Sequence, residues 1–186
     1  MASQKKIQMK NQMQHKPSCA VIIASYNGEK FLSEQIQSIR SQIGVKVDIF
    51  FSDDSSNDRS HDILLKNGCI DLNSSNVSFQ SAAQNFLHAI IEFGSIKKFD
   101  YILLSDQDDI WLPNKIIKAI EQLLINEAEC YSGSYYSWKM HSNKMKYVNK
   151  SYSQNEIDFY FRSPGPGFTF CFTSNAFQKI QTSINE

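Results

Sequence analysis

The chain has 186 residues, of which 41% are hydrophobic, and its 19 Lys and Arg residues balance its 19 Asp and Glu residues. This length suits one domain with a substantial core, and a mean hydropathy of -0.38 excludes a disordered chain or one built mainly of membrane spans. The zero net charge gives no electrostatic basis for nucleic acid as a partner. Any anionic ligand must therefore be bound by local groups.

Residues 1–17 are predicted to form a flexible leader. They include Lys5, Lys6 and Lys10 but no apolar stretch long enough for secretion or membrane spanning. A solvated tail is the preferred interpretation, and attraction of these lysines to anionic lipid is the alternative. The four cysteines are far apart and lack metal-ligand spacing, which indicates free thiols in a reducing cytoplasm.

The first strand is predicted over residues 19–24, an apolar run that breaks at Ser25 into a turn of small and polar residues. An amphipathic helix should follow this turn. Its expected buried face consists of apolar residues at helical spacing: Leu32, Ile36, Ile39 and Ile43.

A second apolar strand is predicted over residues 45–51, directly before an acidic loop over residues 52–58. A helix from about 57 to 66 should end at Gly68, because glycine readily adopts the left-handed conformation that terminates helices. Residues 69–72 are expected to form a short third strand.

A further helix should begin near Ser81 and end at Gly94, and the next strand is predicted over residues 101–104. The expected apolar face of this helix consists of Ala82, Phe86, Ile90 and Phe93. The alternation of strands and helices predicts an α/β fold with right-handed crossovers and a mainly parallel sheet covered on both faces.

Three carboxylates, on Asp106, Asp108 and Asp109, lie within four residues just after the predicted strand 101–104. Such a cluster repels itself unless a cation or a sugar hydroxyl compensates, so it indicates a divalent metal site with oxygen ligands. Capping of the predicted helix 115–124 by Asp109 and Asn114 is the alternative. The acidic loop 52–58 favours the site, because ligands of open parallel sheets bind outside the carboxyl ends of the strands.

Beyond about residue 130 the chain interleaves aromatic residues with Ser, Asn and Lys. These aromatic residues are Tyr131, Tyr135, Tyr136, Trp138, Tyr147, Tyr152, Phe159, Tyr160 and Phe161. Aromatic faces pack well against the CH faces of sugars, which predicts an acceptor-binding surface. For any single ring, core packing is the preferred interpretation. Residues 163–167 form a breaker-rich loop, and residues 168–172 are predicted to be a strand.

The three strand ends, in this order, resemble the nucleotide-sugar-binding half of family-two inverting glycosyltransferases of GT-A fold. The similarity is good over residues 18–126, and its motifs occupy residues 21–28, 31–32, 35–42, 52–58, 85–86 and 100–115. The segment Asp106-Gln107-Asp108-Asp109-Ile110-Trp111, followed by Pro113-Asn114-Lys115, is most similar to the rhamnosyltransferase-like branch, whose members build bacterial surface polysaccharides.

This resemblance implies a GT-A, Rossmann-like fold with a mainly parallel sheet flanked by helices. Residues 18–126 would form the nucleotide-sugar-binding α/β half. Residues 127–186 would form a partial, small and mixed acceptor-side region of the same domain.

The resemblance also implies roles for particular residues. The nucleotide base would contact the end of the first strand, at Ala24, Ser25 and Tyr26. Asp53 or Asp54 would accept the imide N–H of uracil or thymine. Asp106 and Gln107 would bind the donor, and Asp108, with Asp106 as a second candidate, would bind Mn²⁺ or Mg²⁺. Trp111 is expected to pack beneath the loop rather than to stack on a ligand.

The implied activity is metal-assisted, inverting transfer of a sugar, with rhamnose expected, from a dTDP- or UDP-sugar to a saccharide or lipid-linked saccharide acceptor. We expect a cytoplasmic enzyme, peripheral at the inner face of the cell membrane. The segment 80–85 lacks the basic residue that many relatives carry there, which leaves phosphate neutralisation to the metal.

An inverting transferase needs a general base, and no candidate is found. Glu156 and Asp158 precede the usual position of this carboxylate, and Glu186 is terminal. We expect a chain truncated at its C-terminal end. Its last strand would then lack cover, which favours self-association through three exposed rings: Phe170, Phe172 and Phe177.

Three alternatives remain open from the sequence. The first is a sugar-nucleotide-binding fragment without catalysis. The second is a sugar nucleotidyltransferase, although no Gly-rich phosphate loop with Lys or Arg lies near the first strand. The third is a receiver-like signalling domain, which would place an acidic pair after the first strand, where this chain has Ser25 and Tyr26.

Overall fold

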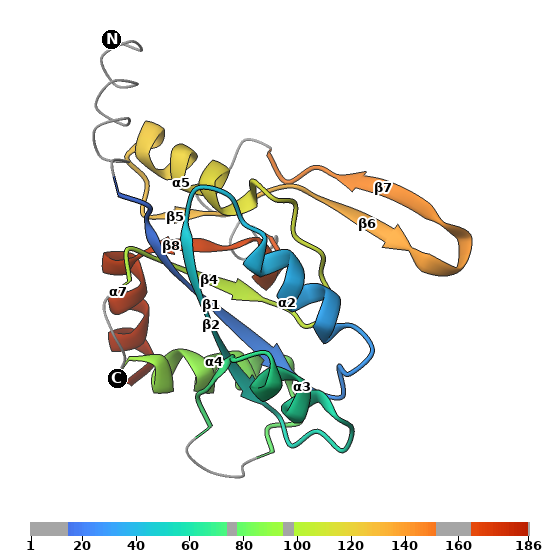
Figure 1. Cartoon of the computed structure of the whole chain (residues 1–186). Helices are drawn as coiled ribbons and strands as arrows, with labels where there is room; N and C mark the ends of the chain where they lie inside the picture. Colours follow the sequence, from blue (N-terminus) through green and yellow to red (C-terminus); the bar gives the residue numbers. More distant parts are fainter. Residues whose placement is uncertain (1–14, 74–77, 95–98, 152–164, 186) are drawn as a thin grey trace.

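The computed structural model describes residues 15–73, 78–94, 99–151 and 165–185. Its main sheet has six strands in the order β3-β2-β1-β4-β8-β5, and a separate two-stranded hairpin, β6-β7, projects from one side (Figure 1). The strands of the main sheet are β1 (Ser18–Ser25), β2 (Lys46–Asp53), β3 (Ile70–Asp71), β4 (Tyr101–Ser105), β5 (Cys130–Tyr131) and β8 (Cys171–Thr173). The first four are parallel, whereas β8 is antiparallel to both β4 and β5.

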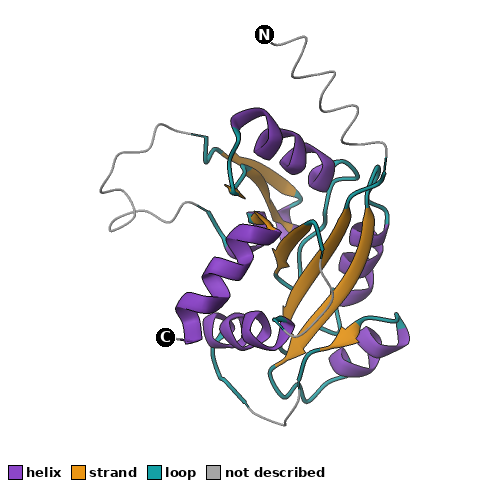
Figure 2. Cartoon of the chain, turned by 90° about the vertical axis from the view of Figure 1, so that its left-hand side faces the viewer, coloured by secondary structure: helices purple, strands orange, loops and turns teal. Residues whose placement is uncertain are grey.

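Helices cover both faces of the sheet (Figure 2). One face carries α2 (Leu32–Arg40), α3 (Ser60–Lys66) and α5 (Lys115–Asn126), and the other carries α4 (Ala82–Phe93) and α7 (Ser174–Asn185). The central strand β1 alternates between the two cores: Val21 and Ile23 belong to the first, and Ala20 and Ile22 to the second. All four are fully buried, as expected for a parallel strand covered on both sides.

The predicted helix that follows β1 forms as α2, but it ends earlier than the apolar spacing suggested. Leu32, Ile36 and Ile39 are buried, whereas Ile43 is 64% exposed beyond the helix end at Arg40. The main chain of Ile43 instead donates a hydrogen bond to the carbonyl oxygen of Pro113, at 2.8 Å. The prediction for Ile43 is therefore wrong, because the chain leaves the helix to pair with another loop.

Two other helices differ in detail from the predictions. α3 begins at Ser60 rather than near 57, and Gly68 adopts the expected left-handed conformation, with φ of +66°. In α4, Ala82 is exposed, and the buried face consists of Asn85, Ala89, Ile90 and Phe93.

The predicted strand 168–172 is only partly correct. Residues Gly167–Thr169 form a 3-10 turn, η2, and the strand β8 occupies Cys171–Thr173. The helix α7 then covers this region, so that Phe172 and Phe177 are 9% and 2% exposed. The expectation that these two rings would be exposed is wrong, because α7 supplies the missing cover. Phe170 is half-buried.

The aromatic segment after residue 130 forms the hairpin of β6 (Tyr135–Lys139) and β7 (Lys144–Val148), joined through a 3-10 turn, η1 (Met140–Ser142). Tyr136, Trp138 and Tyr147 are each about half exposed, so core packing is wrong for these rings. Tyr152, Phe159, Tyr160 and Phe161, like Glu156, Asp158 and the leader up to residue 14, lie outside the described residues. Across the described ranges, no helix combines the length and apolarity needed to cross a membrane.

Candidate functional site

A cavity of about 830 Å³ lies at the carboxyl ends of β1, β2 and β4 and beside the start of α4. This volume is within the range usual for small-molecule sites. The cavity brings together seven of the eight residues predicted to bind the donor or metal: Ala24, Ser25, Tyr26, Asp54, Asp106, Gln107 and Asp108. Parallel strands explain this convergence, since their carboxyl ends share one edge of the sheet.

Gln107 fixes the end of β1 rather than extending freely into the cavity. Its Oε1 accepts hydrogen bonds from the main-chain N–H of Tyr26 (2.8 Å) and from Ser25 Oγ (3.3 Å), and its Nε2 donates to the Tyr26 carbonyl (2.9 Å). A Cβ atom at Gly28 would collide with this Gln107 amide. Gly28 therefore leaves the space in which the Gln107 amide makes these hydrogen bonds.

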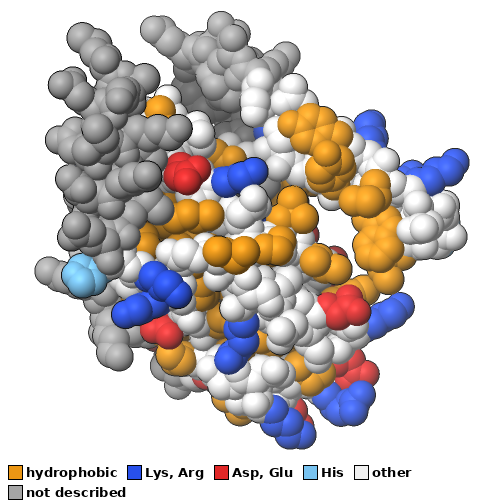
Figure 3. Space-filling model, turned by 45° about the horizontal axis from the view of Figure 1, so that its top comes forward, with side chains coloured by type: hydrophobic (Ala, Val, Ile, Leu, Met, Phe, Trp, Pro, Cys, Tyr) orange, Lys and Arg blue, Asp and Glu red, His pale blue; other side chains and the backbone are white. Residues whose placement is uncertain are grey.

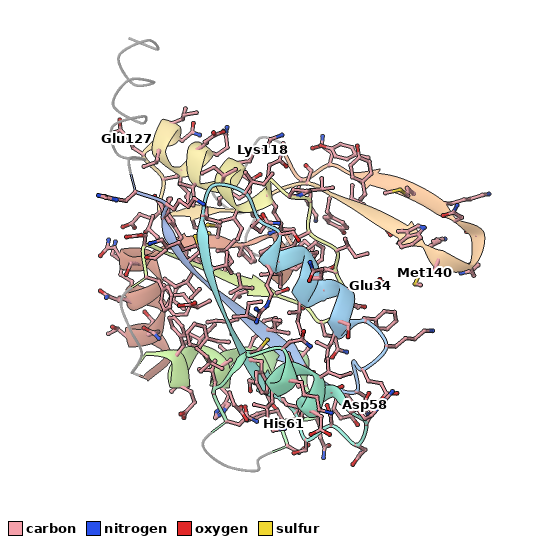
Figure 4. The ribbon with its side chains drawn as sticks, viewed as in Figure 1. Glu34, Asp58, His61, Lys118, Glu127 and Met140 are labelled. Carbon is pink, nitrogen blue, oxygen red and sulfur yellow. The ribbon has the colours of Figure 1, made fainter. Side chains whose placement is uncertain are left out.

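A second set of hydrogen bonds joins the loop after β1 to the acidic loop after β2. The main-chain N–H of Asn27 donates to Ser56 Oγ (2.9 Å), and that of Gly28 to Ser60 Oγ (2.7 Å). Asp58 lies at the start of α3 (Figure 4), where its carboxylate accepts the N–H groups of Glu29 and Ser60. Asp58 thus has a structural role, and its hydrogen bonds hold its pKa below the ordinary value, although burial acts in the opposite direction.

Asp53 and Asp54 are adjacent but face different surroundings. Both oxygens of Asp53 accept hydrogen bonds from Ser56, from its N–H (2.9 Å) and its Oγ (2.6 Å), and Asp53 does not line the cavity. Asp54 does line the cavity, and its Oδ1 accepts the N–H of Phe79. Asp54 is therefore the carboxylate that can meet a ligand, whereas Asp53 shapes its own turn.

Asn85 is a cavity residue to which the sequence analysis gave no role. It is 2% exposed, and its Nδ2 donates to the carbonyls of Ser25 (3.2 Å) and Ser52 (3.1 Å), which ties the ends of β1 and β2 together. Its buried Oδ1 has no hydrogen-bond partner among the described residues. The signal that could have found it is a polar residue at helical spacing from the apolar residues Ala89 and Phe93.

The acidic loop after β4 concentrates negative charge. Burial, and then the charge of Asp108, raises the pKa of Asp106. Burial raises the pKa of Asp109 to about 7, with further increases from Asp106 and Asp108 and an opposing effect of Lys115. Asp108 is exposed at the cavity, whereas Asp109 does not line it.

The residues after this loop serve packing. Trp111 is 4% exposed, and Lys115 Nζ lies 3.8 Å from the centre of its ring. Trp111 thus packs beneath the loop, as predicted. The Asn114 side chain makes no capping hydrogen bond to α5, so helix capping does not explain its position.

The family model described as glycosyl transferase family 2 matches residues 20–181. The chain belongs to this family. It is 38% identical over 153 residues to the dTDP-rhamnosyl transferase RfbG of Shigella flexneri, a match that covers 80% of this chain and 52% of that protein. It is 28% identical over 166 residues to the glycosyltransferase GlyG of Streptococcus pneumoniae serotype 4, covering 87% of this chain and 48% of that one. The chain thus spans about half the length of these relatives.

Solved glycosyltransferase structures share the fold. Residues 1–349 of Staphylococcus aureus TarS, in complex with UDP-GlcNAc, superpose with a TM-score of 0.64 at 15% identity, over 88% of this chain and 47% of that one. The mannosyltransferase PcManGT of Pyrobaculum calidifontis, in complex with GDP-Man and Mn²⁺, gives 0.62 at 12% identity, over 90% and 48%. The chain therefore has the GT-A fold, and its membership of glycosyl transferase family 2 contradicts the nucleotidyltransferase and receiver-like alternatives.

The described part of the chain has no group of three or more His, Cys, Asp or Glu side chains that could enclose a metal ion. A divalent ion does not require such a group in phosphate-binding enzymes, where one or two carboxylates and the substrate phosphates hold it. Asp106 and Asp108, both at the cavity, form a donor set of this kind. The residues present therefore fit Mn²⁺ or Mg²⁺ bound together with a diphosphate.

Proposed function

We propose that the cavity binds a pyrimidine nucleoside diphosphate sugar, with dTDP-rhamnose as the favoured donor, and that the enzyme transfers the sugar with inversion. The observation that carries this proposal is the convergence of Asp54, Asp106 and Asp108 on one cavity at the carboxyl ends of three strands. The similarity to a protein named a dTDP-rhamnosyl transferase supports the choice of donor.

In this proposal, Asp54 accepts the imide N–H of thymine or uracil. A carboxylate suits this task because it is an acceptor only when it is ionised. Ala24, Ser25 and Tyr26 border the base, and Gln107 positions Tyr26 through the two main-chain hydrogen bonds described above. Asn85, whose buried Oδ1 lacks a partner among the described residues, offers one further acceptor at the cavity.

Asp108 is proposed as the direct metal ligand, with Asp106 as the second carboxylate. When bound, Mn²⁺ or Mg²⁺ neutralises the diphosphate and stabilises the nucleoside diphosphate as it leaves. The described residues that line the cavity include no Lys or Arg. Without a cation, Asp106 and Asp108 would therefore repel the phosphates of the donor.

We propose a saccharide or lipid-linked saccharide as the acceptor, in the synthesis of a surface polysaccharide, and a cytoplasmic location at the inner face of the membrane. The name of one relative, the Escherichia coli glucosyltransferase WfgD, includes a diphosphoundecaprenol-linked acceptor, which supports a lipid-linked acceptor here. The match to WfgD is 25% identical and covers 62% of this chain.

Calorimetric titration with dTDP and UDP, in Mn²⁺, in Mg²⁺ and in chelator, tests the donor and metal roles together. We expect strong binding only with metal, and its loss in Asp108→Asn. Asp48→Asn is the matched control, because Asp48 is an exposed acid near the opposite end of β2. Equal affinity in chelator would contradict the metal role, and full affinity of Asp108→Asn would contradict the assignment of this ligand.

The donor is tested with a panel of sugar nucleotides, by thermal shift and by release of nucleoside diphosphate. We expect dTDP-rhamnose to give the largest shift and the fastest release in the presence of Mn²⁺. A clear preference for UDP-hexoses with no response to dTDP-rhamnose would exclude the rhamnosyl assignment while leaving the glycosyltransferase assignment intact.

A further inference from the structure

The β6-β7 hairpin has one apolar face and one basic face. Directly opposite residues of an antiparallel pair share a face, and the pairs Tyr136–Tyr147 and Trp138–Met145 follow each other two residues apart, on the same face. The pairs Ser137–Lys146 and Lys139–Lys144 occupy the other face, together with Tyr135–Val148 at the base of the hairpin. In Figure 3 hydrophobic side chains run along one side of the hairpin and Lys side chains along the other.

The apolar face is exposed over its whole length. Tyr136, Trp138, Met145 and Tyr147 are between 48% and 66% exposed, and Met140 at the turn is 58% exposed. The face is also ordered by its own contacts. The rings of Tyr136 and Tyr147 lie 5.3 Å apart, and Trp138 Nε1 donates to Asn143 Oδ1 at 3.1 Å.

The charge of this region differs from that of the chain. Residues 130–155 contain four lysines and no Asp or Glu, whereas the whole chain has a net charge of zero. Three of these lysines, Lys139, Lys144 and Lys146, belong to the hairpin, and all three are exposed. The hairpin thus combines exposed Trp, Tyr and Met side chains with a local excess of positive charge.

We propose that the β6-β7 hairpin docks the enzyme on an anionic phospholipid surface. Trp and Tyr rings suit the membrane interface because they combine an apolar body with a polar atom. The lysines lie on the opposite face of the hairpin, and their long side chains let the charges reach anionic headgroups beside it, at about 1 kcal/mol for each charge near the surface. This inference deepens the membrane location proposed above and is independent of donor binding.

Charge complementarity favours lipid over the other occupants of this face. A second hairpin packed ring to ring against the first would leave the lysines of both without a charged partner, because they lie on the opposite faces. A neutral saccharide would cover the rings but give the lysines no partner. An anionic membrane satisfies both faces, because the apolar side chains enter the interface while the long lysine side chains reach the headgroups.

The experiment measures sedimentation of the full chain with vesicles of phosphatidylcholine alone or mixed with phosphatidylglycerol. We expect binding only to the anionic vesicles, and weaker binding as salt is raised. The triple variant Lys139→Gln, Lys144→Gln, Lys146→Gln should bind about a hundredfold more weakly, because each lysine contributes about fivefold. The triple variant Lys30→Gln, Lys46→Gln, Lys66→Gln is the control, since these lysines are exposed away from the hairpin. This variant should lose much less affinity for the vesicles.

Tryptophan fluorescence reports insertion of the hairpin itself. The chain has two Trp residues, and Trp111 is already buried, so a blue shift on vesicle addition must come from Trp138. We expect this shift in the natural chain and none in Trp138→Phe. Replacement of both Trp138 and Met145 by Ser should weaken vesicle binding but leave the metal-dependent affinity for dTDP unchanged.

Several results would overturn the inference. The first two are equal binding to neutral and anionic vesicles, and binding without a blue shift. The third is a loss of vesicle affinity in the variant Lys5→Gln, Lys6→Gln, Lys10→Gln that equals or exceeds the loss in the hairpin triple variant. Concentration-dependent dimerisation that disappears in the Trp138 and Met145 double variant, without vesicle binding, would assign the face to a second copy. Failure to bind dTDP in the natural chain would instead contradict the donor proposal and leave the vesicle result unaffected.

Discussion

Asp53 and Asp54 are neighbours with the same side chain, and the surroundings of each carboxylate give it a different task. Both oxygens of Asp53 are satisfied by Ser56, whereas Asp54 lines the cavity. Gln107 shows the same effect, since its amide is bonded on both sides to the main chain of Tyr26. At this scale, whether a side chain uses all of its polar atoms within the protein separates a residue that shapes the site from one that can meet a ligand.

The role of Asp54 predicts a change in base preference. Uracil presents an N–H at the position where cytosine presents an acceptor, so the Asp54 carboxylate should favour UDP over CDP. In Asp54→Asn the amide can donate as well as accept, so we expect the ratio of the CDP and UDP dissociation constants, measured with Mn²⁺, to fall about tenfold or more. The control Asp53→Asn should keep the ratio. A ratio unchanged in Asp54→Asn and reduced in Asp53→Asn would reverse the assignment.

Asn85 should contribute to stability as well as to the shape of the cavity. Asn85→Ala removes the two donations to the buried carbonyls of Ser25 and Ser52, so the free energy of unfolding should fall by about 1–3 kcal/mol. Urea denaturation measures this change. Asn126→Ala, at an exposed position on α5 where the amide bonds only within its own helix, should cost less than about 1 kcal/mol. Equal losses in the two variants would show that the link between strands contributes little.

The helix α7 is the element that closes the second core. Phe177 packs edge to face against Phe93 of α4 at 5.5 Å and lies 6.1 Å from Phe172 of β8. Gln181 Nε2 adds a hydrogen bond to the carbonyl of Ile90, at 2.7 Å. α7 therefore links α4 to the antiparallel strand β8 and covers apolar rings that the bare sheet would expose.

This packing predicts a large effect of truncating one ring. Phe177→Ala should lower the free energy of unfolding by about 3–5 kcal/mol, because it removes a fully buried ring and leaves a cavity. Chemical denaturation followed by circular dichroism measures the loss. The matched control Leu87→Ala lies on α4 at a position that is 45% exposed and should cost about 0.5 kcal/mol. A small effect of Phe177→Ala would mean that α7 does not close this core in solution.

Across the whole molecule, the cavity is assembled although the chain spans about half the length of its relatives. Among the described residues, the carboxylates that line the cavity are Asp54, Asp106 and Asp108, and we propose that all three bind the base or the metal. Deprotonation of the acceptor hydroxyl requires a further group, which the described residues do not supply at the cavity. Donor binding and transfer should therefore be separable.

We predict that the 186-residue chain binds dTDP with Mn²⁺ but transfers sugar about a hundred- to ten-thousand-fold more slowly than a version extended to the length of its relatives. The measurement is turnover of dTDP-rhamnose with a lipid-linked saccharide acceptor, for both versions under the same conditions. Comparable dTDP affinity in the two versions is the internal control. Comparable turnover would show that the general base lies within residues 1–186.

The sequence by itself determined the class of the fold and the strand ends at which the cavity lies. Continuous apolar runs predicted β1, β2 and β4, because a strand covered on both faces must be apolar throughout. The helical spacing of apolar residues and the turn residues between these runs predicted the helices. Acidic residues directly after β2 and β4 located the cavity, since parallel strands bring their ends together. Helix boundaries were less well predicted, as at Ile43 and Ser60, because contacts with distant loops set them.

Only the tertiary structure decided which carboxylate faces the cavity, that Asn85 joins two strand ends, and that α7 covers Phe172 by packing Phe177 against it. Each of these depends on contacts between segments far apart in the chain, and local periodicity carries no information about such contacts. The hairpin is the clearest case. Its alternation of rings and lysines is visible in the sequence, but their exposure depends on whether another element packs against them, and only the folded arrangement leaves that face open to solvent.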